Sequence, residues 1–156
     1  MELTPVWEYV SDMVMGGVST GKIRSENISG RTATRLTGHV SLENNGGFVQ
    51  MAFDLMPDGQ NFNAAGWTGI ELDVIGNLEN YDCRLRTDLL ERPWQSYRTS
   101  LVAPEKWARL QLSFVEFQPH RTTMPLNLSR IRRIGVLAIG REFEADIAVS
   151  SVRLFR

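Results

Sequence analysis

Cysteine is almost absent from this sequence, and histidine is scarce. Cys83 is the one cysteine, so no disulfide can form within the chain, as is usual for a protein of a reducing compartment. His39 and His120 are the only histidines, and no spacing of His and Cys resembles a zinc site. We therefore expect no disulfide framework, no metal and no cofactor.

Long apolar runs and an excess of one charge are missing too. No apolar stretch approaches the ~20 residues that span a bilayer, and the N-terminus lacks the basic and apolar regions of a secretory signal. The formal net charge of -1 gives no electrostatic reason to expect nucleic-acid binding. We expect a cytoplasmic protein without a membrane span, in which residues 1–156 form one domain.

Short stretches with an apolar residue at every second position fill most of the chain. This period predicts half-buried β-strands, whereas an apolar stripe of helical period is absent. The predicted strands cover residues 36–42, 49–55, 70–74, 81–85, 97–101, 110–114, 134–139 and 147–154. A change of phase near Ser150-Ser151 predicts a β-bulge, and residues 126–132 hold one short helical turn at most. The pattern predicts an all-β fold, an antiparallel β-sandwich or jelly roll.

Two stretches, residues 11–21 and 38–48, place a Gly-Gly pair among short polar side chains. The residues of this loop motif are Asp12, Gly16, Gly17, Ser19, Glu43, Asn44, Asn45, Gly46 and Gly47. Short polar side chains beside glycine close turns through hydrogen bonds to the backbone. We therefore predict that the two loops pack together at one end of the sandwich. The side chains predicted to bond backbone groups there are those of Asp12, Ser19, Glu43 and Asn44.

The same loops partly match three other kinds of site. Residues 16–22 match the glycine and lysine positions of a phosphate-binding loop, but Ile23 stands where Ser or Thr would bind magnesium, and no helix follows. Asp12 and Glu43 are compatible with a structural Ca²⁺ site, or with acid–base chemistry that also uses His39. Turn-closing carboxylates and a surface histidine explain these residues more simply, so we expect no catalytic residue.

A second cluster has the composition of a binding face. Arg84 and Arg86 share one face of their predicted strand, and Trp94, Tyr97 and Arg98 follow closely. Arg, Trp and Tyr carry much of the energy of protein interfaces, and aromatic rings also stack on sugars or bases. These five residues are the predicted contact with a protein partner, a small molecule or a glycan. The alternative is that Trp94 only covers one end of the core.

The sequence resembles the complex I intermediate-associated protein 30 family over nearly its whole length. The resemblance is carried first by the two glycine loops, which are the most specific part of the match. Its other parts are Trp7, residues 81–87 and 92–98, Trp107, and residues 114–117 and 134–154.

This resemblance implies a galactose-binding-like jelly roll and a non-enzymatic role. Mitochondrial members of the family are assembly factors that act as chaperones on membrane-arm intermediates of respiratory complex I, and related domains adjoin NAD(P)-binding Rossmann domains. Without a transit peptide or a dinucleotide fold, this chain is more similar to the stand-alone bacterial members. The implied function is a binding module that assists assembly of a respiratory or other multi-subunit complex; the alternative is a carbohydrate- or metabolite-binding module.

Overall fold

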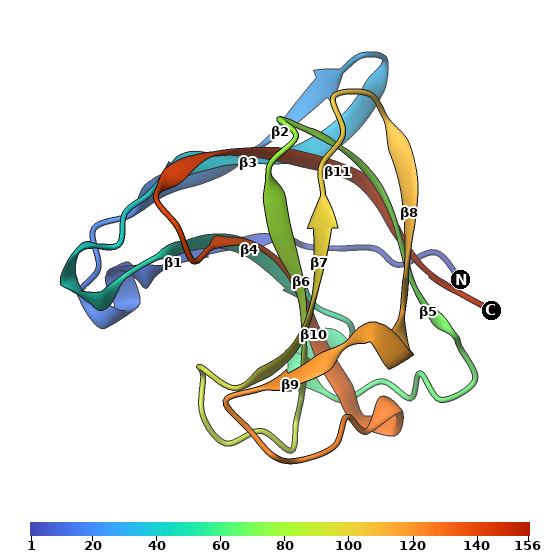
Figure 1. The fold of residues 1–156 in the computed structure, drawn as a ribbon. Coiled ribbons are helices and arrows are strands. Elements are labelled where there is room, and N and C mark those ends of the chain that lie inside the picture. Colours follow the sequence, from blue (N-terminus) through green and yellow to red (C-terminus); the bar gives the residue numbers. More distant parts are fainter.

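The fold is described from a computed structural model that covers residues 1–156. Its strands are β1 Glu8–Ser11, β2 Thr20–Ile28, β3 Arg31–Val40, β4 Phe48–Asp54, β5 Gly69–Gly76, β6 Asn80–Thr87, β7 Ser96–Val102, β8 Ala108–Ser113, β9 Gln118–His120, β10 Ile131–Ile139 and β11 Phe143–Phe155. They form two antiparallel sheets, with the orders β1-β4-β10-β6-β7-β9 and β2-β3-β11-β5-β8. The sheets pack face to face, and the two chain ends lie near each other (Figure 1). The predicted all-β sandwich of the jelly-roll type is confirmed.

The core lies between the sheets because alternate side chains of each strand point inward. Val49, Met51 and Phe53 of β4 are fully buried, while Gln50 and Asp54 on the opposite face of the strand are partly exposed. The ring of Trp7 meets that of Phe53 edge to face, with 4.9 Å between centroids. In β11 the pairing with β5 shifts between Val149 and Ser151, which confirms the predicted bulge.

Some local predictions need correction. Leu42 does not extend strand β3, which ends at Val40, and its side chain is exposed. Strand β2 was not predicted because its outward side chains are charged and few of its inward ones are apolar. Helical structure is limited to short 3₁₀ turns: η1 Asp12–Met15, η2 Glu43–Asn45, η3 Pro57–Gly59, η4 Phe114–Glu116 and η5 Leu128–Arg130. The last of these lies where a short helical turn was predicted.

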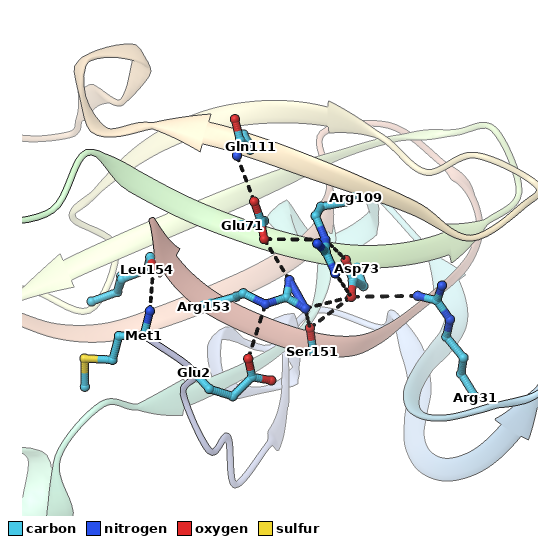
Figure 2. A network of polar contacts seen from close by, with 10 residues as sticks. All are labelled: Met1, Glu2, Arg31, Glu71, Asp73, Arg109, Gln111, Ser151, Arg153 and Leu154. Carbon is cyan, nitrogen blue, oxygen red and sulfur yellow. Dashed lines mark hydrogen bonds and ion pairs between the residues drawn. The ribbon is translucent and has the colours of Figure 1, made fainter. Parts of the chain in front are cut away.

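Two acidic side chains lie almost buried on the outer face of the five-stranded sheet (Figure 2). Asp73 accepts hydrogen bonds from Arg109 at 3.0 Å, from Ser151 at 3.1 Å and from Arg153 at 2.9 Å. The other acid, Glu71, accepts one from Arg153 at 2.9 Å. Arginine is suited to such shared pairing because its guanidinium carries five donors in a fixed plane. The network joins β5, β8 and β11 across the sheet surface.

The N-terminal segment is attached to the same sheet. The amino group of Met1 donates to the carbonyl of Leu154 at 2.9 Å, and the Leu3 N–H donates to Val152 at 2.9 Å. Glu2 forms an ion pair with Arg153 at 3.2 Å (Figure 2). These contacts hold residues 1–3 along the last strand.

We expect the variant Asp73→Asn to lose roughly 3 kcal/mol of unfolding free energy, because it breaks a nearly buried ion-pair network. Burial alone would raise the pKa of Asp73, but Arg109, Ser151 and Arg153 outweigh it and hold the pKa below its usual range. This stabilisation is therefore present above the unfolded pKa and is lost as pH falls through the folded pKa. Urea unfolding between pH 7 and pH 2 should show a shallower acid loss in the variant.

The exposed turn residue Asp58 provides the control, since its side chain makes no hydrogen bond. Asp58→Asn should leave both the stability and its pH dependence unchanged. Equal stability of Asp73→Asn and the parent chain would contradict the structural role of the network.

Candidate functional site

The two glycine loops are joined by one buried carboxylate. Asp12 accepts a hydrogen bond from the Ser19 hydroxyl at 2.5 Å and from the Ser19 N–H at 3.0 Å. It also accepts from the N–H groups of Gly47 at 2.6 Å and Phe48 at 3.2 Å, both from the second loop. Burial would raise the pKa of Asp12, but these donors outweigh it and lower the pKa. The predicted contact between the loops is therefore present and is made by a charged side chain.

Glycine is required in both loops because the Asp12 carboxylate occupies the space of a side chain. A Cβ on Gly17 would lie 2.4 Å from Asp12 Cγ, and one on Gly46 would lie 2.5 Å from Asp12 Oδ2. Ser19 extends the junction, since its hydroxyl also accepts the N–H of Ser41 at 2.9 Å. The loops and the end of β3 thus form one hydrogen-bonded unit.

The prediction for Glu43 and Asn44 is wrong. Both side chains are exposed and make no hydrogen bond to the protein, because η2 turns them toward solvent. Asn44 and Asn45 take positive φ angles of 56° and 58°, a conformation that Asn tolerates better than most residues. Their contribution is the shape of the turn, while its bonding comes from Asp12 and Ser19.

The same loops expose an unusual group of apolar side chains, here named the loop tip. Its members are Met13, Val14, Met15, Val18 and Leu42, of which Val14 is 76% and Met13 is 65% exposed. Three of them lie on η1, a single turn whose only buried residue is Asp12. In Figure 1 this turn and the second loop project side by side at one end of the sandwich. The loop tip was not predicted from the sequence, although the three consecutive apolar residues Met13, Val14 and Met15 within a glycine loop were a signal for it.

Acidic residues lie beside the loop tip. Glu43 is exposed next to Leu42, and Gly140, at the start of the β10–β11 turn, donates its N–H to the carbonyl of Gly47 at 3.0 Å. That turn carries Glu142, which is 3.4 Å from His39. The hydrogen bond from His39 Nδ1 to the Glu144 carboxylate, at 2.6 Å, is the main cause that raises the pKa of His39. Glu43 and Glu142 are therefore exposed near the loop tip, while Arg141 of the same turn is paired with Glu79 and lies over the Phe143 ring.

The acid–base arrangement considered for these loops is not assembled. His39 bonds Glu144 and approaches Glu142, while Asp12 is occupied by hydrogen bonds to the protein's own donors. No group of three or more His, Cys, Asp or Glu side chains is placed to hold a metal ion. Burial, followed by the nearby Asp82, raises the pKa of Cys83 to about 12, so this thiol is not a nucleophile at neutral pH. Asp12 and Cys83 are therefore structural groups, and His39 is a surface residue that contacts two exposed glutamates.

The predicted Arg84–Arg98 face is only partly available for binding. Arg84 lies opposite Arg98 on the outer face of the six-stranded sheet, and its guanidinium donates to Asp82 at 2.8 Å. The guanidinium of Arg86 donates to three backbone carbonyls of the β6–β7 connection, including that of Gln95 at 2.5 Å. Both arginines therefore hold the β6–β7 region in place.

Tyr97 does not belong to this face. It is fully buried, and its hydroxyl donates to the carbonyl of Met124 at 2.9 Å. Successive residues of a strand point to opposite sides, so Tyr97 faces the core where Arg98 faces solvent. Of the five predicted contact residues, Trp94 and Arg98 remain exposed, and Trp94 is 55% accessible beside Arg92.

We expect Asp12→Asn to destabilise the protein by roughly 3 kcal/mol. The carboxylate accepts four hydrogen bonds, and the amide would place an NH₂ donor against some of these donors. The matched control is Glu43→Gln on the facing loop, which should change stability by less than about 0.5 kcal/mol. Hydrogen exchange should show selective loss of protection at the N–H groups of Ser19 and Gly47. Unchanged exchange there would contradict the anchoring role of Asp12.

The fold is similar to that of solved carbohydrate-binding modules. A family 11 carbohydrate-binding module from Clostridium thermocellum, in complex with a beta-1,3-1,4-mixed-linked tetrasaccharide, matches with a TM-score of 0.77 and 13% identity, over 99% of this chain and 94% of that one. A family 30 module of a cellulosomal cellulase of the same organism matches with a TM-score of 0.70 and 13% identity, over 99% and 94%. At these identities the likeness shows the fold alone.

Sequence comparison is more specific. A search of curated proteins finds no match. The family described as Complex I intermediate-associated protein 30 (CIA30) matches residues 2–149, which confirms the resemblance found in the glycine loops. The chain therefore belongs to the complex I intermediate-associated protein 30 family.

Proposed function

We propose that this protein is a non-enzymatic, chaperone-like assembly factor that binds a protein partner, such as a subunit of a respiratory complex of the complex I type or of another multi-subunit complex. Family membership supports the class of partner. The observation that carries the proposal is the exposed loop tip, held on loops that Asp12 fixes. We propose a cytoplasmic site of action, consistent with the free, buried thiol of Cys83.

The loop tip has the properties of a docking surface. Single exposed apolar residues are common on proteins, but contiguous groups mark interaction sites. Met13 and Met15 are flexible and polarisable, so they can adapt to an uneven partner surface. The backbone beneath them is fixed by the bonds of Asp12, which reduces the entropy lost on binding.

Charge indicates the chemistry of the partner. Glu43 and Glu142 are exposed beside the loop tip, so a complementary partner presents an apolar patch bordered by Lys or Arg. An anionic lipid surface would be repelled by the same carboxylates. The proposed partner is therefore a protein surface, such as one left uncovered in an incomplete complex.

The alternative is a glycan- or metabolite-binding module that uses the Arg84–Arg98 face. Its remaining support is Trp94, which is exposed with the Arg92 guanidinium 5.9 Å from the ring centroid. Aromatic faces of this kind stack on sugars. A thermal-shift screen of glycans with the parent chain and Trp94→Ala tests this alternative, which requires a shift that the variant loses.

Replacing both methionines of the loop tip, as Met13→Ser/Met15→Ser, should reduce recovery of the partner at least tenfold in an affinity pull-down from the native cell, because the central apolar contacts are lost. Quantitative mass spectrometry of the recovered complex subunits provides the measurement. The melting temperature should not fall, since both side chains are exposed.

Val115→Ser is the matched control, because Val115 is 85% exposed on η4 in a different part of the chain. It should leave partner recovery unchanged. The proposed function is wrong if the double variant recovers complex subunits as well as the parent chain does. It is also wrong if the parent chain recovers no subunit of any multi-subunit complex and deletion of the gene leaves complex I assembly normal.

A further inference from the structure

A cavity of about 170 Å³ lies beneath the N-terminal segment, away from the residues used by the proposed function. It is lined by Glu2, Leu3, Pro5, Trp7, Ser25, Thr32, Ala33, Thr34 and residues 149–152. A neighbouring hollow of about 300 Å³ shares Pro5, Trp7, Ser25 and Thr34 and adds Ile23 and Arg24. The shared residues place Trp7 at the wall between the two spaces.

The wall above the cavity is fixed in place. The Leu3 N–H donates to Val152 at 2.9 Å, and the Leu154 N–H donates to the carbonyl of Met1 at 2.9 Å. After Trp7 the chain enters β1, which pairs with β4. The segment is therefore held at both ends, so the cavity beneath it is largely pre-formed, as ligand sites usually are.

The floor of the cavity departs from the pattern of the core. In the register of the five-stranded sheet, Ser25 lies opposite Thr34, and Ile23 lies opposite Leu36. Opposed residues of an antiparallel pair share one face, so Ser25 and Thr34 lie on the inner face, on which Leu36 is buried. Thr32 lies two residues before Thr34 and follows on the same face. At the cavity, the inner face of this sheet therefore carries the hydroxyls of Ser25, Thr32 and Thr34 in place of aliphatic side chains.

These hydroxyls are available to a ligand. The side chains of Ser25, Thr32 and Thr34 make no hydrogen bond within the protein, and all three are at least partly exposed. A hydroxyl both donates and accepts, so it can bond the hydroxyl of a ligand in either direction. Three free hydroxyls on one cavity wall therefore suit a ligand that itself carries several hydroxyl groups.

The remaining lining is aromatic and electrically balanced. The edge-to-face contact with Phe53 fixes the ring of Trp7 while leaving it part of the cavity wall. The two charged lining residues have partners outside the cavity: Glu2 pairs with Arg153 at 3.2 Å, and Arg24 pairs with Glu26 at 3.4 Å. A neutral ligand is therefore favoured over a phosphate or a carboxylate.

We propose that this cavity binds one neutral, polyhydroxylated ring, the chemistry of a pyranose sugar, with an apolar ring face on Trp7 and its hydroxyls bonded by Ser25 and Thr34. The flat face of an aromatic side chain is apolar, so it can pack against the apolar face of the ligand ring. The volumes lie at or below the lower end of the range for drug-sized ligands, so the site takes a single ring. This site is separate from the Arg84–Arg98 face and from the loop tip.

The test uses the full chain and the indole N–H signals of its four tryptophans in NMR titrations with methyl β-glucopyranoside and methyl β-galactopyranoside. At least one glycoside should shift the Trp7 signal with a millimolar dissociation constant, leaving that of Trp94 in place. The double variant Ser25→Ala/Thr34→Val keeps the size of the lining and should weaken binding at least fivefold. Glucuronate, the charged counterpart, should bind more weakly than the neutral glycosides.

Ser100→Ala is the matched control, since it removes an exposed hydroxyl from β7 of the other sheet. It should bind the glycosides as the parent chain does. Three results would overturn the proposal. The first is no shift of the Trp7 signal at tens of millimolar of either glycoside, and the second is a shift at Trp94 instead. The third is equal binding by the Ser25/Thr34 variant and the parent chain. The loop-tip variant Met13→Ser/Met15→Ser should retain glycoside binding. The glycoside proposal can therefore hold even if the proposed assembly function is wrong.

Discussion

The loop end of the sandwich depends on the buried carboxylate of Asp12. A charge removed from water is tolerated only when donors replace the water, and here four hydrogen bonds from Ser19, Gly47 and Phe48 do so. These bonds require the backbone to come close, which explains glycine at positions 17 and 46. The most specific part of the family resemblance is therefore the set of residues that surround one carboxylate.

The exposed loop tip follows from the same constraint. Because Asp12 takes the single inward position of η1, Met13, Val14 and Met15 must point toward solvent. A chain that only needed to close this turn would favour polar residues there. Asp12 thus stabilises the fold and at the same time presents the surface proposed to bind a partner.

Strands could be predicted wherever an alternating pattern had apolar residues on its inner face, as in β4 and β6. Strand β2 was missed because Ser25 stands on its inner face where an apolar residue was expected. The separation of Tyr97 from Arg98 is predictable from the sequence, because neighbouring residues of a strand point to opposite sides and Tyr97 shares the apolar side with Leu101. The run Met13-Val14-Met15 was a signal for an apolar loop, but its exposure depends on the contact of Asp12 with a loop distant in sequence, which the sequence alone does not show. The same holds for the cavity at Trp7, which requires the N-terminal segment to lie across β11.

Arginine is abundant for structural reasons visible across both sheets. Arg35 binds Asp146 through two donors, at 2.8 and 2.7 Å, and Arg153 joins Glu71 and Asp73. Since a planar guanidinium can satisfy two acceptors at once, these residues cover the outer sheet faces with paired charge. Composition alone could not separate a structural role of the arginines from ligand binding. Arg84 and Arg86 have the structural role, because their guanidinium groups bond acceptors within the chain.

Strand β1 connects the two proposed binding regions. Trp7 immediately precedes this four-residue strand and Asp12 immediately follows it, so the two residues are about 17 Å apart at most along an extended chain. The strand lies at the edge of its sheet and pairs only with β4. Its position relative to β4 therefore sets both the wall of the cavity and the anchor of the loop tip. Any displacement of β1 must alter both regions, which makes this short strand the physical link between the two proposed binding activities.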